Sequence, residues 1–318
     1  MKRLAIVVPC YNEEEVLHET NKHLTALLNK LINDNKIANN SFVLYVNDGS
    51  KDTTWNVINE LYNNSNLVHG LNMAGNKGHQ NALYAGLMQV KDEVDVTVSI
   101  DADMQDDINA IELMIDKYNN EGCEIVYGVR DNRDTDSFFK RFTAQSFYKV
   151  MTLMGAKSIY NHADFRLMSN RAVDELSQYS ETHLFLRGIA TELGFKTDSV
   201  YYARAERFAG ESKYPFKKMV SFAFNGITSF SVKPLTLILN IGILVIIASI
   251  LFVFYSIIQY FNGAVISGWA STFASIWFLG GVQLASIGII GTYLGKNFME
   301  TKKRPRYYIE SYLNHNDK

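Results

Sequence analysis

The longest uncharged stretch of the chain constrains its fold more than any other feature. From Pro234 to Gly295 the sequence contains no Asp, Glu, Lys, Arg or His, although 20% of the whole chain is charged. About 20 apolar residues are enough to cross ~30 Å of hydrocarbon, and two such segments fit here, at about 235–260 and 270–294. We therefore predict a hairpin of two transmembrane helices. A buried helical hairpin of a soluble core is the alternative.

Basic residues flank this predicted hairpin on both sides and are absent from the short turn within it. They are Lys217, Lys218 and Lys233 before the first span, and Lys296, Lys302, Lys303, Arg304 and Arg306 after the second. Because positive flanking charge stays in the cytoplasm, we expect a multi-pass protein of the cell (plasma) membrane with both termini cytoplasmic. Two cysteines cannot build a disulfide framework, and a net charge of −2 gives no signal for a nucleic-acid partner.

The residues before the hairpin alternate short apolar runs with longer amphipathic segments. The runs expected to be buried strands are Leu4–Cys10, Phe42–Asn47, Val68–Asn72, Val96–Ile100 and Ile125–Val129. The segments expected to be helices are Glu13–Asn33, Thr53–Asn63, Gly78–Val90 and Asn109–Asn120. Such alternation predicts an α/β fold, with a mainly parallel, Rossmann-like sheet and helices on both faces.

Polar side chains follow the predicted strands where each strand ends. They lie in residues 9–13, in residues 47–52, at Asp101 and Asp103, and at Arg130. Ligands of such sheets bind outside the carboxyl ends of the strands. Each of these motifs is weak alone, but their joint placement predicts one crevice.

Asp101 and Asp103 are candidate ligands of a divalent cation. Hard carboxylate oxygens suit Mg²⁺ or Mn²⁺, and Gln105 in the same turn is a third candidate ligand. We interpret Asp106 and Asp107 as solvated loop acids, with helix capping as a further role for Asp106. Neither a P-loop nor a dinucleotide-binding glycine motif is present, which argues against an ATPase or a dehydrogenase.

A cation held by two carboxylates implies a diphosphate substrate, whose remaining charge arginines would neutralise. Residues 204–214 are cationic and contain Gly and Ser, as expected of a lid over phosphates. Residues 137–155 and 214–230 mix basic and aromatic residues at helical spacing, which is typical of helices in a membrane interface; for the first, packing in the core is an equal alternative. Together these features predict a soluble activated donor that meets a lipid acceptor.

The chain resembles family 2 glycosyltransferases with the GT-A fold, and among them the polyprenyl-phosphate glycosyltransferases of the dolichol-phosphate mannose synthase and bactoprenol glucosyltransferase types. The resemblance covers nearly the whole chain. It rests on V-V-P-C-Y-N-E-E-E at 7–15, V-N-D-G-S-K-D at 46–52, N-K-G-H-Q-N-A-L-Y-A-G at 76–86, D-A-D-M-Q-D at 101–106, A-D-F-R-L-M at 163–168, R-F-A-G-E-S-K-Y at 207–214, and the C-terminal spans with K-K-R-P-R-Y-Y-I-E.

This resemblance implies roles for individual residues. Nucleotide binding is implied for Pro9, Tyr11, Glu13, Asp48 and Asp101, and metal binding for Asp101, Asp103 and Gln105. Phosphate or acceptor binding is implied for Arg130, Arg141, Arg166, Arg207 and Lys213. Asp164 matches the proposed catalytic base, with Asp103 and Arg207 also assigned to catalysis; Ala163 departs from the Gly that relatives often carry before that Asp.

The expected domains are a cytoplasmic GT-A catalytic domain at 1–213, an interfacial helix at 214–231, two transmembrane helices within 232–295, and a basic, Tyr-rich cytoplasmic tail at 296–318. The tail could form a strand that pairs with another subunit, giving a homo-oligomer, or with its own sheet.

The expected activity is inverting transfer of glucose or N-acetylglucosamine from a UDP-sugar to undecaprenyl phosphate, with Mg²⁺ or Mn²⁺ as cofactor. The product would be a lipid-linked sugar for cell-envelope glycosylation, handled by a separate flippase and a downstream glycosyltransferase. Transfer from GDP-mannose and a processive polysaccharide synthase are the alternatives.

Overall fold

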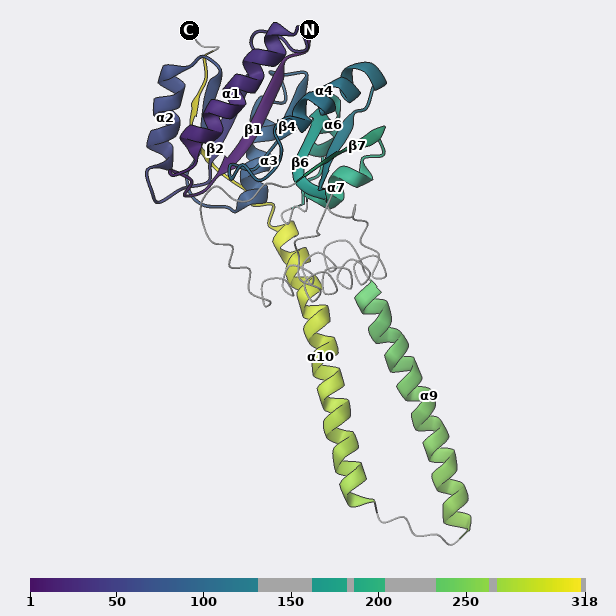
Figure 1. The fold of residues 1–318 in the computed structure, drawn as a ribbon. Coiled ribbons are helices and arrows are strands. Elements are labelled where there is room, and N and C mark those ends of the chain that lie inside the picture. The colour runs from purple at the N-terminus through teal and green to yellow at the C-terminus, as the bar shows by residue number, and fades with distance from the viewer. Residues whose placement is uncertain (131–161, 182–185, 204–232, 263–267, 316–318) are drawn as a thin grey trace.

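An eight-stranded mixed sheet forms the centre of the catalytic part (Figure 1). The computed structural model describes residues 1–130, 162–181, 186–203, 233–262 and 268–315. The strands are β1 (Leu4–Cys10), β2 (Phe42–Asn47), β3 (Val68–Met73), β4 (Val96–Ser99), β5 (Ile125–Arg130), β6 (His162–Ser169), β7 (Thr197–Tyr202) and β8 (Ile309–Leu313). Their order across the sheet is β7-β5-β6-β4-β1-β2-β3-β8.

The sheet is mostly parallel, as predicted. β1 pairs in parallel with β2 and β4, β2 with β3, and β5 with β7. Among the described strands, β6 and β8 run antiparallel to their neighbours. β6 is not among the strands predicted from the sequence. Of the two partners predicted for the tail strand, the structure has its own sheet, because β8 pairs with β3 of the same chain.

Helices cover both faces of this sheet, which explains why its central strands are continuous apolar runs. They are α1 (Leu17–Asn33), α2 (Thr54–Asn64), α3 (His79–Val90), α4 (Ala110–Glu121), α6 (Asn170–Ser177) and α7 (Leu186–Glu192). One core contains apolar residues of α1, α2 and α4, and the other contains those of α3, α6 and α7. The predicted α/β layers are therefore confirmed. The first helix begins at Leu17 rather than at Glu13, because residues 14–16 form a turn in which the Glu13 carbonyl accepts from Val16 N at 3.1 Å.

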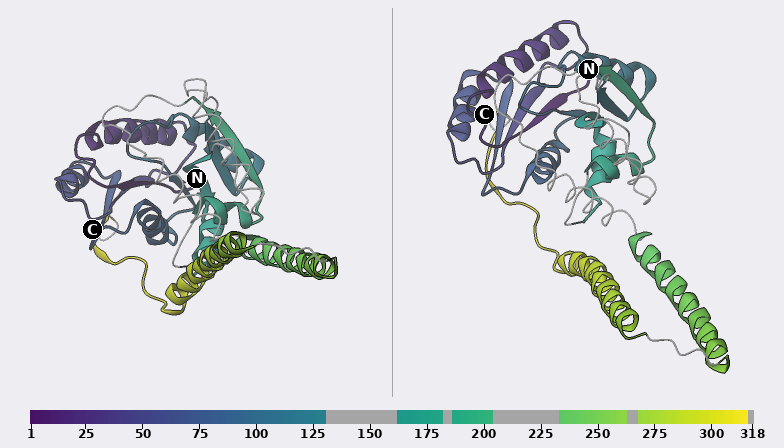
Figure 2. Two further views of the ribbon diagram at one scale, coloured as in Figure 1. Left: turned by 90° about the horizontal axis from the view of Figure 1, so that it is seen from below. Right: turned by 60° about the horizontal axis from the view of Figure 1, so that its bottom comes forward.

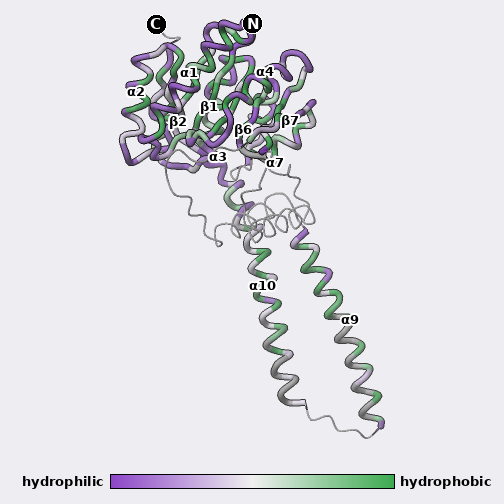
Figure 3. Tube along the Cα trace, viewed as in Figure 1, coloured by the Kyte–Doolittle hydropathy of each residue, from purple (hydrophilic) through white to green (hydrophobic). Residues whose placement is uncertain are grey.

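Two long helices leave the catalytic part on the same side, α9 (Lys233–Phe261) and α10 (Trp269–Thr301) (Figures 1 and 2). Many of their apolar side chains are exposed, including Leu244 at 67% and Ile287 at 63%. Figure 3 shows hydrophobic residues along both helices. Within the described residues, 278–301 is long and apolar enough to cross a membrane, and 233–245 is a shorter apolar segment. α10 continues beyond the predicted end at 294. The predicted helices at 137–155 and 214–231 lie outside the described residues.

Candidate active site

The reversed direction of β6 brings the candidate site together. The parallel strands β1, β2 and β4 end at one edge of the sheet, and β6 begins at that same edge. Ser99 at the end of β4 pairs with Arg166 of β6, and the Ser99 hydroxyl donates to the Asp164 carbonyl at 2.5 Å. Asp164 therefore lies beside the turn that carries Asp101 and Asp103.

His79 joins two carboxylates of this site. Its Nε2 lies 3.4 Å from Asp101 Oδ1 and 3.4 Å from Asp164 Oδ2. Burial raises the pKa of Asp101 to about 6; His79 opposes this rise, while Asp164, Asp106 and Asp103 add to it. These four aspartates form the carboxylate cluster of the site, and their mutual repulsion favours the binding of a cation.

The turn after β4 fits a hard divalent cation. Asp101 and Asp103 supply carboxylate oxygens from one short segment, the donor type that Mg²⁺ and Mn²⁺ prefer. Between Asp103 and Gln105, Met104 has a φ of +56°, a left-handed conformation that is uncommon for a non-glycine residue and is found at turns and at functional sites. Gln105 is buried, and its backbone N–H donates to Asp103 Oδ1 at 3.3 Å. The metal-binding roles of these residues stay predictions.

Asp106 corrects the sequence interpretation. It is 3% exposed, so the prediction that it is a solvated loop acid is wrong. Its Oδ1 accepts from Arg130 Nη2 at 2.9 Å, from Arg130 Nε at 3.2 Å and from the Tyr202 hydroxyl at 2.6 Å. The physical reason is the pairing of β5 with β7, which sets Arg130 opposite Tyr202 and brings both to this carboxylate.

Arg166 is a buried link within the site. Its side chain is 1% exposed. Nη1 donates to the Leu186 carbonyl at 3.0 Å, and Nη2 lies 3.5 Å from Asp164 Oδ1. Asp164 thus lies between His79 and Arg166. The acceptor-binding roles of Arg166 and Arg130 stay predictions, and the contacts described here tie both guanidinium groups to aspartates.

Asp48 shapes the loop that leads into α3. It is 2% exposed, and its two carboxylate oxygens accept from Lys77 N at 2.6 Å and Gly78 N at 2.9 Å. The next residue, Gly49, has a φ of +60°, and a Cβ there would lie 2.5 Å from Asn76 N. Only glycine fits such a close approach of two backbone segments.

The other predicted nucleotide contacts lie at the same edge, at the end of β1 and in the residues that follow it. Pro9 is buried in β1, Tyr11 is 41% exposed, and Glu13 is partly exposed. Their roles stay predictions. Arg141, Arg207 and Lys213 lie outside the described residues.

His79 is the site residue that the sequence analysis did not single out. The motif at 76–86 placed the start of a helix beside the donor, but its histidine drew no separate interpretation. One feature of the sequence could have identified it: His79 directly follows Gly78, which caps the start of a helix at the carboxyl edge of the sheet.

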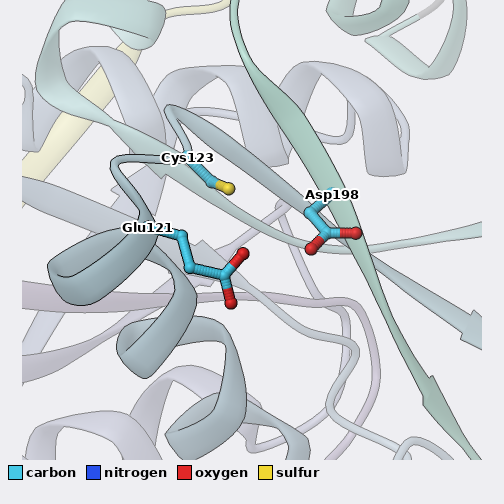
Figure 4. Close-up of side chains that lie close together, drawn as sticks. All are labelled: Glu121, Cys123 and Asp198. Atoms are coloured by element: carbon cyan, nitrogen blue, oxygen red, sulfur yellow. The ribbon is translucent and has the colours of Figure 1, made fainter.

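A second group of ligand-type side chains lies near the amino ends of β5 and β7, away from the carboxyl edge. Figure 4 shows these side chains. Among the described residues, Glu121, Cys123 and Asp198 form the group of three such side chains whose ligand atoms lie within 4.8 Å of one another. The ammonium of Lys117 already forms ion pairs with Asp198 and Glu121, and burial raises the pKa of the Cys123 thiol. We interpret this group as a structural ion pair beside a buried thiol.

The α/β sheet has its carboxylate cluster at the carboxyl edge, where ligands of such sheets bind. Comparison with known sequences gives the class of the enzyme: the chain is a glycosyltransferase and belongs to glycosyl transferase family 2, which it matches over residues 5–177.

Two relatives match it over nearly their whole length. The chain is 53% identical to the uncharacterized glycosyltransferase YkoT of Bacillus subtilis (strain 168), over 96% of this chain and 91% of that one. It is 38% identical to the prophage bactoprenol glucosyl transferase homolog of Escherichia coli (strain K12), over 97% and 98%.

Among solved structures, the chain is similar to glucosyl-3-phosphoglycerate synthase from Mycobacterium tuberculosis in complex with Mn²⁺, UDP-glucose and phosphoglyceric acid. The TM-score is 0.44 and the identity 13%, over 71% of this chain and 78% of that one.

Proposed function

We propose that this glycosyltransferase transfers a hexose from a UDP-sugar to a polyprenyl phosphate at the cytoplasmic face of the membrane. The observation that carries the proposal is the carboxylate cluster at the carboxyl edge of the sheet, in a chain that also has long apolar helices. The near full-length similarity to relatives named bactoprenol glucosyl transferase supports the lipid acceptor. Glucose and N-acetylglucosamine are the leading sugars, and GDP-mannose is a lesser candidate donor.

The topology proposed for this reaction is a hairpin. α9 and α10 correspond to the two uncharged segments, and basic residues precede the first and follow the second. Positive flanks on both sides favour a topology with the catalytic domain and both termini in the cytoplasm. A lipid phosphate in the inner leaflet would then reach the site from the side on which the helices leave the domain (Figure 1).

The proposed reaction is a single displacement. A phosphate oxygen of the acceptor attacks the anomeric carbon, the bond from that carbon to the nucleoside diphosphate breaks, and the configuration inverts. Asp101 and Asp103 would hold a divalent cation, which would supply positive charge for the departing diphosphate when bound. His79 keeps Asp101 and Asp164 in place, at 3.4 Å from each.

Asp164 fits an orienting role better than that of a base. A phosphate monoester has a second pKa of ~6, so the acceptor is mostly ionised at neutral pH and has little need of a base. The Asp164 carboxylate is buried between Arg166 and His79. We propose that Asp164 holds these two side chains toward the acceptor. Equal loss of activity in Asp164→Asn at pH 6 and pH 9 is the result expected for orientation, and a loss confined to low pH would indicate a base.

The deciding experiment uses the full chain in vesicles. The vesicles contain undecaprenyl phosphate and Mg²⁺, and each assay adds one radiolabelled nucleotide sugar: UDP-glucose, UDP-N-acetylglucosamine or GDP-mannose. We expect one UDP-sugar to label the extracted lipid. Asp103→Asn is expected to lower the rate by ~10²–10³, as loss of one well-placed electrostatic group does.

Asp107→Asn is the matched control, because Asp107 lies in the same turn and accepts from the backbone of Asn109 at 2.9 Å, away from the cluster. Label in a polymer rather than in a lipid would favour the processive synthase. An Asp103→Asn variant as active as the wild type, or activity that persists in EDTA, would overturn the metal site.

A further inference from the structure

The segment after α10 is fastened to the catalytic domain before it forms β8. The Arg306 guanidinium lies 4.6 Å from the centroid of the Tyr84 ring. Its Nη2 also donates to the Tyr179 carbonyl. The ring of Tyr307 meets Tyr84 edge-on with centroids 6.3 Å apart, and the Tyr308 carbonyl accepts from Ala74 N at 2.9 Å. Four successive contacts therefore fix the path from α10 to the sheet.

Acidic residues accompany these contacts. Glu181 follows α6, and Glu300 lies in the last turn of α10. The pKa of Glu181 is raised by burial and by the carboxylate of Glu300, and Arg306 opposes this rise. Glu300 at the end of α10 and Arg306 after it therefore both act on one carboxylate of the catalytic domain.

Tyr84 belongs to the helix that begins in the active site. It lies on α3 five residues after His79, which is about 7.5 Å along the helix axis. His79 contacts Asp101 and Asp164, while Gln80 Oε1 accepts from Leu186 N at 2.9 Å. The carbonyl of that same Leu186 accepts from Arg166. One helix therefore touches the fastened segment at Tyr84 and the carboxylate cluster at its first turn.

We propose that Arg306 and Tyr84 are positioning residues. They couple the attachment of α10 to the catalytic domain with the position of the active-site helix α3. This inference rests on the proposed function, in which α10 is anchored in the membrane and the acceptor comes from it. A guanidinium can stack on a ring and donate a hydrogen bond at the same time, whereas an ammonium presents a point charge. The coupling sets the height and tilt of the carboxylate cluster relative to the lipid phosphate, so it matters for an acceptor held in the bilayer and not for one that arrives from solution.

The test compares two acceptors in the full chain reconstituted into vesicles. One is undecaprenyl phosphate in the bilayer, and the other is geranyl phosphate supplied from solution. We expect Arg306→Ala to lower kcat about tenfold for the bilayer acceptor, with donor KM and the rate for the soluble acceptor within twofold of wild type. Arg306→Lys should resemble Arg306→Ala, and Tyr84→Phe, which keeps the ring, should restore most of the rate that Tyr84→Leu loses. Arg304→Ala is the matched control, because Arg304 is exposed two residues away.

Amide hydrogen exchange of residues 77–82 separates this inference from the proposed function. We expect Arg306→Ala, but not Arg304→Ala, to speed exchange there at least threefold. If the wild type transfers sugar to neither acceptor while exchange still responds, the proposed function fails and the coupling stands. Unchanged exchange, or an equal loss of rate with both acceptors, overturns the coupling.

Discussion

His69 makes the stability of the catalytic domain depend on pH, with a sign and size that follow from its surroundings. The side chain is 2% exposed on β3 and stacks on Phe42 with ring centroids 3.9 Å apart. Tyr312 of β8 meets it edge-on, and His315 lies at a centroid distance of 5.7 Å. Burial first, and then the charges of His315 and Arg3, lower the pKa of His69 from 6.5 to about 4.

This lowered pKa means that acid destabilises the fold. Between pH 6.5 and pH 4 the unfolded chain binds a proton at His69 that the folded chain does not, so the free energy of unfolding falls as the pH falls through this window. The neutral His69 side chain contributes fully to the free energy of unfolding above pH 6.5, and this contribution is lost as the pH falls toward 4. The shift corresponds to about 3 kcal/mol at its limit, and to about 2 kcal/mol at pH 5.

The assay is urea unfolding of the full chain in detergent micelles, followed by intrinsic fluorescence between pH 7.5 and pH 4.5. His69→Gln, which cannot titrate, should remove about 2 kcal/mol of the loss between pH 7 and pH 5, whatever it does to the absolute stability. His23→Gln is the matched control, because the His23 side chain is 45% exposed. Parallel pH profiles of the wild type and His69→Gln would refute the reasoning.

Three further changes test the site and its support. Gly49→Ala should destabilise the chain by about 1–3 kcal/mol in urea unfolding and weaken UDP binding in calorimetry. Gly122→Ala is the control, because Gly122 also has a positive φ but no atom lies within 4 Å of the added Cβ. The difference between the two variants in free energy of unfolding then measures the cost of the backbone contact at Gly49. His79→Gln should lower kcat by about 10- to 100-fold in the transfer assay, because a hydrogen bond to a charged group contributes about 1.5–3 kcal/mol; an unchanged kcat would remove His79 from the mechanism. Asp106→Asn should lower the free energy of unfolding by about 3 kcal/mol, because Arg130 loses its charged partner; a loss of activity without a loss of stability would contradict this structural role.

The parallel half of the sheet could be predicted because local patterns determine it. Leu4–Cys10 and Phe42–Asn47 are apolar runs of strand length, and the structure gives these bounds unchanged. Their burial on both faces removes the polar alternation that would otherwise obscure a strand. The polar residues after β1, β2 and β4 meet at one edge, as the topology of parallel sheets requires.

The antiparallel additions depend on contacts that no local pattern reveals. β6 sits between β4 and β5, and its partners Val98 and Val126 are distant from Leu167 in sequence. β8 follows α10 and pairs with β3, which lies far from it in the sequence. Predicting the Tyr-rich tail as a strand was possible, but choosing its partner required the tertiary structure.

Asp106 shows why exposure is the hardest property to infer for a polar motif. All three aspartates of D-A-D-M-Q-D belong to the carboxylate cluster, but the last one is buried and bonded to Arg130 and Tyr202. In the sequence, Asp106 is one more acid of a loop, and nothing local distinguishes it from the neighbouring Asp107. The difference comes from β7, more than 90 residues later, whose tyrosine closes over one of them.

The charge balance of the site explains which groups remain for the substrate. Arg130 is held by Asp106, and Arg166 by Asp164 and the Leu186 carbonyl, so the two arginines described near the cluster already have partners within the protein. His79 bridges Asp164 and one further carboxylate, that of Asp101. A nucleoside diphosphate is negatively charged, and the aspartates of the site repel it. It can bind there only if cations bind as well. The predicted sources are a divalent ion at Asp101 and Asp103 and the basic residues Arg207 and Lys213. Donor affinity should therefore depend far more on the divalent ion than on Arg130, and a calorimetric titration of UDP with and without Mg²⁺, in the wild type and in Arg130→Lys, compares the two directly.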